Sequence, residues 1–228
     1  MSSSRRIAAI GAFAILILLI AELATWGNPQ VSDPINKITD YFVGARSIAL
    51  VSVFISMVLA IVYLVFGAAI RATLQVEDDR PSVLPEIAFG AAVLMAAAQL
   101  GLAAATGSLA VIGAQASEGE MRVLLGLTSW MDMFRVLALG VVVGSTSLAV
   151  LRRGTVRRWI GWLGVAASAL LLVSQVSALD PTGPIGNMGN ASMVGLLLLV
   201  VWLIAFGVAL LRAGNAATIT LAAERAVG

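Results

Sequence analysis

Six long apolar stretches divide this sequence, and they constrain its fold more than any other feature. Each is about as long as the 20 or so residues that cross about 30 Å of hydrocarbon as a helix. They do not alternate apolar and polar residues, as the strands of a membrane barrel do. The sequence therefore predicts an all-α fold, a polytopic transmembrane helical bundle of about six spans, as a single domain over residues 1–228. The six predicted spans are residues 7–26, 47–70, 86–108, 131–151, 159–179 and 191–212.

The composition supports this fold class and narrows the function. Of the 228 residues, 60% are hydrophobic and 11% are charged, whereas soluble domains carry about 25% charged residues. The chain has no cysteine and no histidine, which excludes thiolate nucleophiles, His-ligated haem or zinc, and Ser-His or Cys-His catalytic pairs. It also lacks a Walker A loop, a dinucleotide-binding glycine motif and a basic face for nucleic acid. We therefore expect no cofactor, no metal, no nucleic-acid partner and no enzymatic activity.

The basic residues are unevenly divided between the two sides of the predicted membrane. Ten lie on the side of the termini and four on the other. Because the connecting loops are short, this bias predicts that the first side is cytoplasmic and that both termini lie there. The ten are Arg5, Arg6, Arg71, Arg80, Arg152, Arg153, Arg157, Arg158, Arg212 and Arg225, and the four are Lys37, Arg46, Arg122 and Arg135.

The first apolar stretch has features of a secretory signal peptide, because Arg5 and Arg6 precede it. The residues that follow it offer only a poor small-x-small cleavage site. We therefore expect a retained first span that ends at Trp26, in the interfacial position that tryptophan favours.

The outer loops contain signals for helix starts. Asp33 and Pro34 read as an N-cap followed by proline at the first helical position. Ser117 and Glu120 have the spacing of a capping box. A helix over 118–151 would be about 50 Å long, longer than one bilayer, so its first part either projects outward or lies along the interface. We expect short amphipathic helices at 34–45 and 118–130 on the outer face, and a turn-rich loop at 180–187.

Five ionisable residues lie near the outer membrane boundary: Glu22, Arg46, Asp132, Arg135 and Asp180. In one interpretation they form an outward-facing polar pocket, in which Glu22 pairs with Arg46 or Arg135 and meets a ligand headgroup. In the other they are interfacial ion pairs that fix the register of the helices and reach toward water. The sequence leaves both interpretations open.

Other polar and small residues within the spans favour structural roles. Gln99 and Gln175 lie deeper, where an interhelical hydrogen bond is the expected role. Glu86 falls in the first turn of its span, where a carboxylate complements the helix dipole. Gly140 and Gly144 form a GxxxG pattern that permits close approach of a second helix.

The stretch from Ala149 to Val165 joins the fourth and fifth spans by a short, arginine-rich turn, with Trp159 and Trp162 following it. This hairpin, mainly Arg152–Val165, resembles that of uncharacterised alanine-rich six-span membrane proteins of actinobacteria. The chain departs from them at Arg157, where proline is usual. The resemblance implies the six-span layout and a bacterial plasma-membrane location, and it implies no activity.

Two functions follow as hypotheses. The leading one is a non-enzymatic integral membrane protein, an accessory, scaffold or lipid-interacting component of the plasma membrane. Its expected partners are membrane lipids and other membrane-protein subunits. The alternative is a small-molecule or lipid transporter or binding protein that uses the outer cluster of Glu22, Arg46, Asp132, Arg135 and Asp180.

Overall fold

A computed structural model describes residues 3–25, 29–75, 82–154, 156–176 and 189–227, with side chains described in these ranges except at 189–192 and 213–227. The described part is helical and contains no strand. A short π-helical segment, η1 (Asp40–Gly44), follows the second helix. The helices are α1 (Ser3–Ala24), α2 (Ile35–Thr39), α3 (Arg46–Gln75), α4 (Leu84–Ile112), α5 (Glu118–Arg153), α6 (Arg158–Ser174) and α7 (Gly189–Val227).

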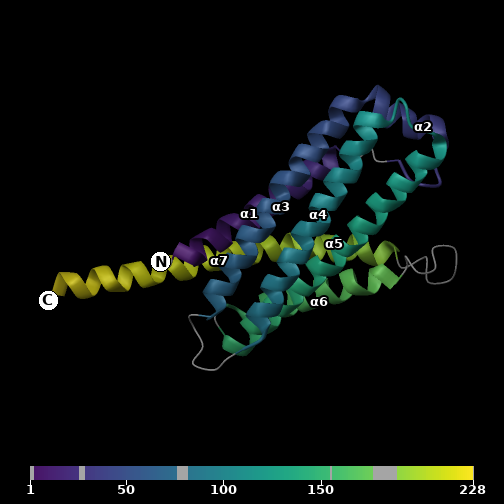
Figure 1. Ribbon diagram of the computed structural model, residues 1–228. Helices are drawn as coiled ribbons and strands as arrows, with labels where there is room; N and C mark the ends of the chain where they lie inside the picture. Colours follow the sequence, from purple (N-terminus) through teal and green to yellow (C-terminus); the bar gives the residue numbers. More distant parts are fainter. Residues whose placement is uncertain (1–2, 26–28, 76–81, 155, 177–188, 228) are drawn as a thin grey trace.

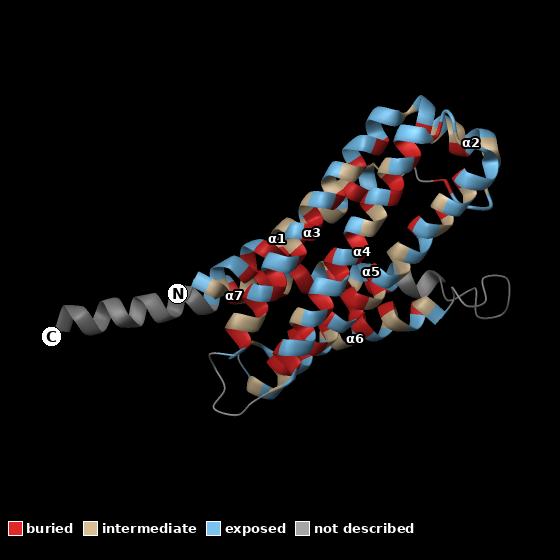
Figure 2. Ribbon diagram, in the orientation of Figure 1, coloured by how far each residue is buried: buried red, intermediate tan, exposed pale blue. Residues whose placement is uncertain are grey.

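Within the described ranges, 5 helices are long and apolar enough to cross a membrane: α1, α3, α4, α5 and the Met193–Arg212 part of α7. The outward faces of these helices are exposed and apolar (Figure 2). On α3, for example, Phe54 is 67% exposed and Ile61 is 62% exposed. Apolar faces of this extent are covered by lipid or by a partner rather than by water. These helices are therefore typical of a protein embedded in a membrane.

The fifth predicted span falls on α6, which has 17 residues. The expected span, 159–179, continues into residues 177–179, which lie outside the described part of the chain. Trp26 and the predicted loop at 180–187 lie outside it as well.

Six of the described helices form a closed ring in chain order. Each packs on the next, α1 on α3, then α4, α5, α6 and α7, and α7 returns to α1. The start of α1 and the last part of α7 lie at one end of the bundle, and α2 lies at the other (Figure 1). We call these the terminal end and the α2 end.

Two separate apolar cores stabilise the fold. The main core fills the interior of the ring and contains fully buried aromatic side chains such as Tyr63, Phe66 and Trp202. The second core lies at the α2 end, where Ile38 and Phe42 pack on residues of α3, α4 and α5. It holds the short helical segment 35–44 against the three long helices that project toward it.

The longest of the three helices at the α2 end is α5, and clear signals mark both of its ends. The Ser117 hydroxyl accepts a hydrogen bond from the Glu120 amide, and the Glu120 carboxylate accepts one from the Ser117 amide, so the predicted capping box is confirmed. Gly154 ends the helix in the left-handed conformation, at φ 66°, which glycine adopts without strain. The 36 residues extend about 54 Å. The segment 118–130 is therefore not a separate helix but the first part of α5, in agreement with the alternative of one helix over 118–151, because nothing in it breaks the helix.

The helix start expected at Asp33 is also different in the structure. Pro34 is the N-cap of α2, and no side chain caps the helix. The Asp33 carboxylate accepts hydrogen bonds from the Gln30 amide, at 2.7 Å, and from Lys37 Nζ, at 2.8 Å. Asp33 therefore closes a turn before the helix. The expected amphipathic helix at 34–45 is present as two short pieces, α2 and η1.

The GxxxG pattern on α5 lies at its contact with α6. The Ser168 hydroxyl donates a hydrogen bond to the Gly140 carbonyl at 2.7 Å, which is possible because no side chain intervenes. A Cβ added at Gly144 would lie 2.5 Å from Ser168 Oγ. The close helix approach predicted from Gly140 and Gly144 is confirmed.

Candidate functional site

A group of polar side chains from four helices meets inside the ring, and Glu22 of α1 is its centre. The Glu22 residue is 8% exposed. Its Oε1 accepts hydrogen bonds from Ser56 Oγ on α3, at 3.0 Å, and from Gln99 Nε2 on α4, at 2.7 Å. Its Oε2 accepts one from Arg135 on α5, at 2.8 Å. Three donors from three other helices thus hold one buried carboxylate.

Arg135 links this carboxylate to a second one. Its guanidinium also donates two hydrogen bonds to Asp132 Oδ1, one from Nε at 3.0 Å and one from Nη2 at 2.5 Å. The two residues stand three apart on α5, so they share a helix face. The side chain of Arg135 is 11% exposed and that of Asp132 is 30% exposed. We call Glu22, Ser56, Gln99, Asp132 and Arg135 the central polar cluster.

One buried oxygen of the cluster lacks a hydrogen-bond partner among the described residues: Gln99 Oε1, whose residue is 0% exposed. The hydroxyl of Tyr63, also 0% exposed, lies beside the cluster within hydrogen-bonding reach of the Arg135 guanidinium. Buried polar atoms are rarely left unpaired in native proteins, so Gln99 Oε1 marks a place where the polar group is incomplete.

The central polar cluster separates the two apolar cores. On α3, Ser56 lies between Ala49 of the core at the α2 end and Leu59 of the main core. On α4, Gln99 likewise lies between residues of the two cores, and so do Asp132 and Arg135 on α5. Measured along α1, Glu22 is about 24 Å from Arg6. The hydrocarbon layer of a bilayer is about 30 Å thick. If one boundary of this layer lies at Arg6, the cluster lies within the layer, close to its opposite boundary.

The structure brings together three of the five residues predicted as an outer cluster: Glu22, Asp132 and Arg135. Arg46 is not with them. It is exposed at the start of α3, about 15 Å along the helix from Ser56, and it forms no ion pair among the described residues. Including Arg46 in the cluster was therefore wrong. Asp180 lies outside the described residues.

The predictions for the other polar residues within the spans had mixed outcomes. Gln99 makes the expected interhelical hydrogen bond, to Glu22. Among the described residues Gln175 makes no such bond, because its amide donates to the Leu171 carbonyl and the Ser174 hydroxyl, both on α6. Glu86 stands in the first turn of α4 and in addition pairs with Arg71 of α3 at 2.9 Å.

Sequence reasoning missed Ser56 and Tyr63. Both occur in a span that carries no charge, and serines and tyrosines are common in such spans, so no local signal separates them. Their positions differ by seven, which places them two turns apart on one helix face. That face becomes recognisable only when α1, α4 and α5 are known to lie against it.

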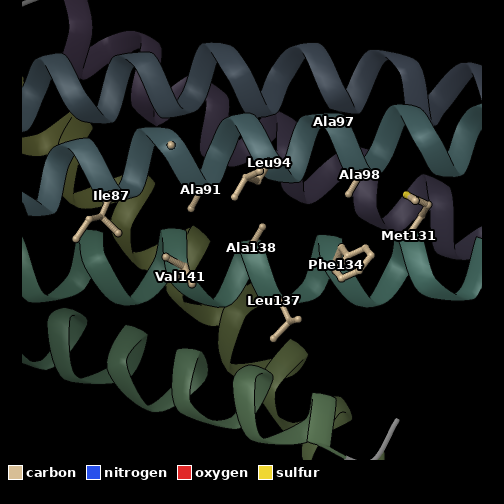
Figure 3. Close-up of a pocket in the computed structure, with 11 residues that line it drawn as sticks. Ile87, Ala91, Leu94, Ala97, Ala98, Met131, Phe134, Leu137, Ala138 and Val141 are labelled. Carbon is tan, nitrogen blue, oxygen red and sulfur yellow. The ribbon is translucent and has the colours of Figure 1, made fainter. Parts of the chain in front are cut away.

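An apolar groove lies between α4 and α5 and has a volume of about 620 Å³. Figure 3 shows its lining side chains, which come from both helices and include no charged or hydrogen-bonding group. Sequence reasoning missed the groove as well, because small residues on α4 create it only where the facing residues of α5 leave room. The lining residues are Ile87, Gly90, Ala91, Leu94, Ala97, Ala98, Met131, Phe134, Leu137, Ala138 and Val141.

Comparison with known proteins gives no relative for this chain. No family model matches it, and no curated protein and no solved structure is significantly similar to it.

Proposed function

We propose that this chain is a non-enzymatic, lipid-interacting protein of the bacterial plasma membrane, with six spans and both termini in the cytoplasm. The ring of six helices supports six spans, because α6 fills the position between α5 and α7. The arginines near both ends of the chain and in the link between α5 and α6 support the orientation. The absence of histidine and cysteine from the sequence supports a function other than catalysis.

The groove between α4 and α5 is the observation that carries this proposal. Its lining on α4 extends from Ile87 to Ala98, about 16 Å along the helix axis. That distance is close to half the thickness of a hydrocarbon core, about 15 Å. One acyl chain of a phospholipid in a single leaflet therefore fits its length, and its wholly apolar lining fits an acyl chain chemically.

The polar groups at the terminal end of the groove give the lipid an orientation. Glu86 precedes Ile87 directly and stands four residues before Gly90, on the same side of α4. It accepts hydrogen bonds from Arg71 and Gln75, and all three are partly or fully exposed. We place the headgroup of an inner-leaflet phospholipid beside Arg71, with its acyl chain directed along the groove toward Ala98.

Photo-crosslinking with a phospholipid that carries a diazirine in one acyl chain tests this proposal. In the native protein we expect crosslinks concentrated on α4 and α5 around Leu94 and Phe134. A Gly90→Trp variant fills the groove and should reduce these crosslinks several-fold. Gly126→Trp is the matched control, because Gly126 is also a helical glycine with nothing within 4 Å of an added Cβ but lies outside the groove. Crosslinks spread at equal yield over the exposed faces of α3, α4 and α5 would contradict a lipid site.

The alternative function, a transporter or binding protein that uses the outer polar residues, is favoured by one observation. Glu22, Asp132 and Arg135 converge on Gln99 inside the ring. Labelling of a Gln99→Cys variant with a small charged thiol reagent separates the two functions, because the native chain has no cysteine. A substrate path from outside predicts rapid labelling, whereas a closed structural cluster predicts protection.

A further inference from the structure

The helices of the ring end at two different levels. The hydrogen bonds of the central polar cluster mark a common level on α1, α3, α4 and α5. α1 ends at Ala24, directly beyond this level, and α6 ends near it at Ser174, less than two turns beyond its contact with Gly140. α3, α4 and α5 continue toward the α2 end for a further 15–26 Å or about that. We call these parts the three-helix extension: residues 46–55 of α3, 100–112 of α4 and 118–134 of α5.

Charged residues bound the apolar surface of the longer helices at both ends. On α3 the exposed apolar face lies between Arg71 and Arg46, which are about 38 Å apart along the axis. On α5 it lies between Arg152 and Arg122, about 45 Å apart. The membrane segment of α7 has 20 residues and extends about 30 Å, the thickness of a hydrocarbon layer. One side of the bundle thus presents a longer apolar surface than the other.

The additional length carries large apolar side chains that remain exposed. Val123 is 73% exposed and Val111 is 60% exposed. A hydrocarbon layer of about 30 Å that begins at Arg152 leaves Val123 about 14 Å outside it. Such a surface is rarely left in contact with water. The exposed apolar residues of the extension include Ile48 and Val51 on α3, Val111 and Ile112 on α4, and Val123 and Leu127 on α5.

This surface continues the face that points toward lipid in the rest of the bundle. On α5, Val123, Leu127 and Phe134 are exposed and fall on one helix face. Phe134 also lines the groove between α4 and α5. On α3 and α4 no charged residue interrupts the exposed apolar face between its ends. The apolar side chains occur on three successive helices, as in a belt, and not on one helix as a single docking partner would need.

The inclination of the helices fits a lipid environment. An apolar helix that is longer than the hydrocarbon layer tilts or draws a thicker bilayer around itself. Figure 1 shows α3 and α4 inclined to α7. Tilting and thickening both keep the exposed apolar side chains of the extension in contact with acyl chains.

We propose that acyl chains cover the three-helix extension, so that this side of the bundle selects phospholipids with long chains. The side formed by α1, α6 and α7 matches a bilayer of ordinary thickness. The protein therefore imposes a difference in thickness on the bilayer around it. This inference rests on the membrane location proposed above, and it does not depend on the lipid in the groove.

Spin labels at single introduced cysteines test the position of the extension, because the native chain has no cysteine. Val111→Cys and Val123→Cys place the label on the extension. Ile61→Cys places it on α3 between the cluster and Arg71, where the residue is 62% exposed. Each protein is reconstituted in dimyristoleoyl, dioleoyl and dierucoyl phosphatidylcholine, in order of increasing bilayer thickness. Collisions of the label with oxygen report lipid, and collisions with a water-soluble nickel chelate report water.

The two kinds of position should respond differently to thickness. In dierucoyl bilayers we expect labels at Val111 and Val123 to collide mainly with oxygen. In dimyristoleoyl bilayers their ratio of oxygen to nickel collisions should fall about 3-fold or more, because the thin bilayer no longer covers the extension. The label at Ile61 should report lipid in all three.

A competition between lipids tests the selection itself. In vesicles that mix dierucoyl lipid with a brominated dimyristoleoyl lipid, quenching of tryptophan fluorescence reports which lipid contacts the protein. We expect the native protein to favour the dierucoyl lipid about 2-fold or more. The double variant Val111→Lys/Leu127→Lys shortens the apolar surface and should lose this preference. Gln115→Lys adds a charge just beyond the end of α4 and is the control, which should keep it.

The results that overturn the proposal are distinct from those that overturn the membrane location. If labels at Val111 and Val123 report water in all three lipids while the label at Ile61 reports lipid, the extension lies outside the bilayer. Labels on the extension that neither reagent reaches would show that protein covers it, which also overturns the proposal. So does a native protein without a lipid preference, or a preference that the double variant keeps. Water at Ile61 as well would refute the membrane location.

Discussion

Glu22 and Arg135 are 113 positions apart in the sequence, yet their side chains meet at 2.8 Å in the interior of the bundle. Their helices, α1 and α5, are not neighbours in the ring. The two side chains therefore reach each other across the interior, and each is about 90% buried. This ion pair ties opposite sides of the ring together at one level.

Removing both partners of this pair should cost less than the sum of removing each one alone. Glu22→Ala or Arg135→Ala leaves a buried charge unpaired, which typically costs about 3–5 kcal/mol of unfolding free energy. The double variant Glu22→Leu/Arg135→Met leaves no unpaired charge at Glu22 and should be less destabilised than the sum of the two single variants. Unfolding in mixed micelles of increasing sodium dodecyl sulfate fraction measures these differences.

Lys37→Ala is the control for this cycle. Lys37 pairs with Asp33 at 2.8 Å, but its side chain is 59% exposed, and exposed pairs contribute about 0–1 kcal/mol. Equal effects of Arg135→Ala and Lys37→Ala would contradict a stabilising role for the buried pair.

Gly164 should be intolerant of even the smallest side chain. A Cβ added there would lie 1.9 Å from Ser147 Oγ on α5 and 2.4 Å from Trp202 Nε1 on α7, so α6 could not keep its place between them. We expect Gly164→Ala to cost about 1–3 kcal/mol, as overpacking does. Thermal unfolding of the purified variant measures this loss.

Gly126→Ala is the matched control for Gly164→Ala. Gly126 lies inside α5 with nothing within 4 Å of an added Cβ, and alanine is favoured over glycine within helices by about 0.5–1 kcal/mol. This variant should therefore be as stable as the native protein or slightly more stable. A destabilised Gly126→Ala, or a neutral Gly164→Ala, would contradict the packing described here.

The helical architecture was predictable because it depends on local patterns. The apolar stretches predicted both ends of α1, α3 and α4, and the start of α7, to within a few residues. The spacing of Ser117 and Glu120 predicted the start of α5. A single helix over 118–151 was considered, but membrane thickness was then used to divide it at residue 130, and this division is absent from α5. A capped helix continues when its sequence contains no breaker and another element packs against it, as α2 packs against α5 here.

The candidate site was only partly predictable. Asp132 and Arg135 share a helix face by their spacing, and Glu22 was conspicuous as a carboxylate in an apolar stretch. Whether Glu22 would meet Arg46 or Arg135 depended on which helices are placed opposite each other in the ring, and sequence spacing contains no information on that. The unpartnered Gln99 Oε1 and the position of Tyr63 beside Arg135 depend on side-chain geometry, which the sequence pattern does not contain.

The capping box at the start of α5 gives a prediction about pH. Hydrogen bonds from the Ser117 hydroxyl and amide to the Glu120 carboxylate lower the pKa of Glu120. A lowered pKa in the folded state means that this stabilisation is present at neutral pH and is lost as the pH falls through the folded pKa. Ser117→Ala removes the hydroxyl and should raise the pKa of Glu120 toward its ordinary value.

Hydrogen exchange detects this change at the amides of the first turn of α5. In Ser117→Ala these amides should exchange several-fold faster at neutral pH than in the native protein, while amides near Gly140 keep their protection. The difference between the two proteins should shrink as the pH falls and Glu120 is protonated in both. A difference that is constant across this pH range would show that Glu120 does not contribute to the cap.

Thiol labelling can test the proposed orientation, since the native chain has no cysteine. Val83 precedes α4 and is 69% exposed, and Ala114 follows α4 and is also exposed. The proposed six-span topology places Val83 in the cytoplasm and Ala114 outside. In right-side-out vesicles, a membrane-impermeant maleimide should therefore label Ala114→Cys at once, and Val83→Cys only after the membrane is permeabilised. The reverse pattern would invert the orientation, and labelling of both variants from outside would mean that α4 does not cross the membrane.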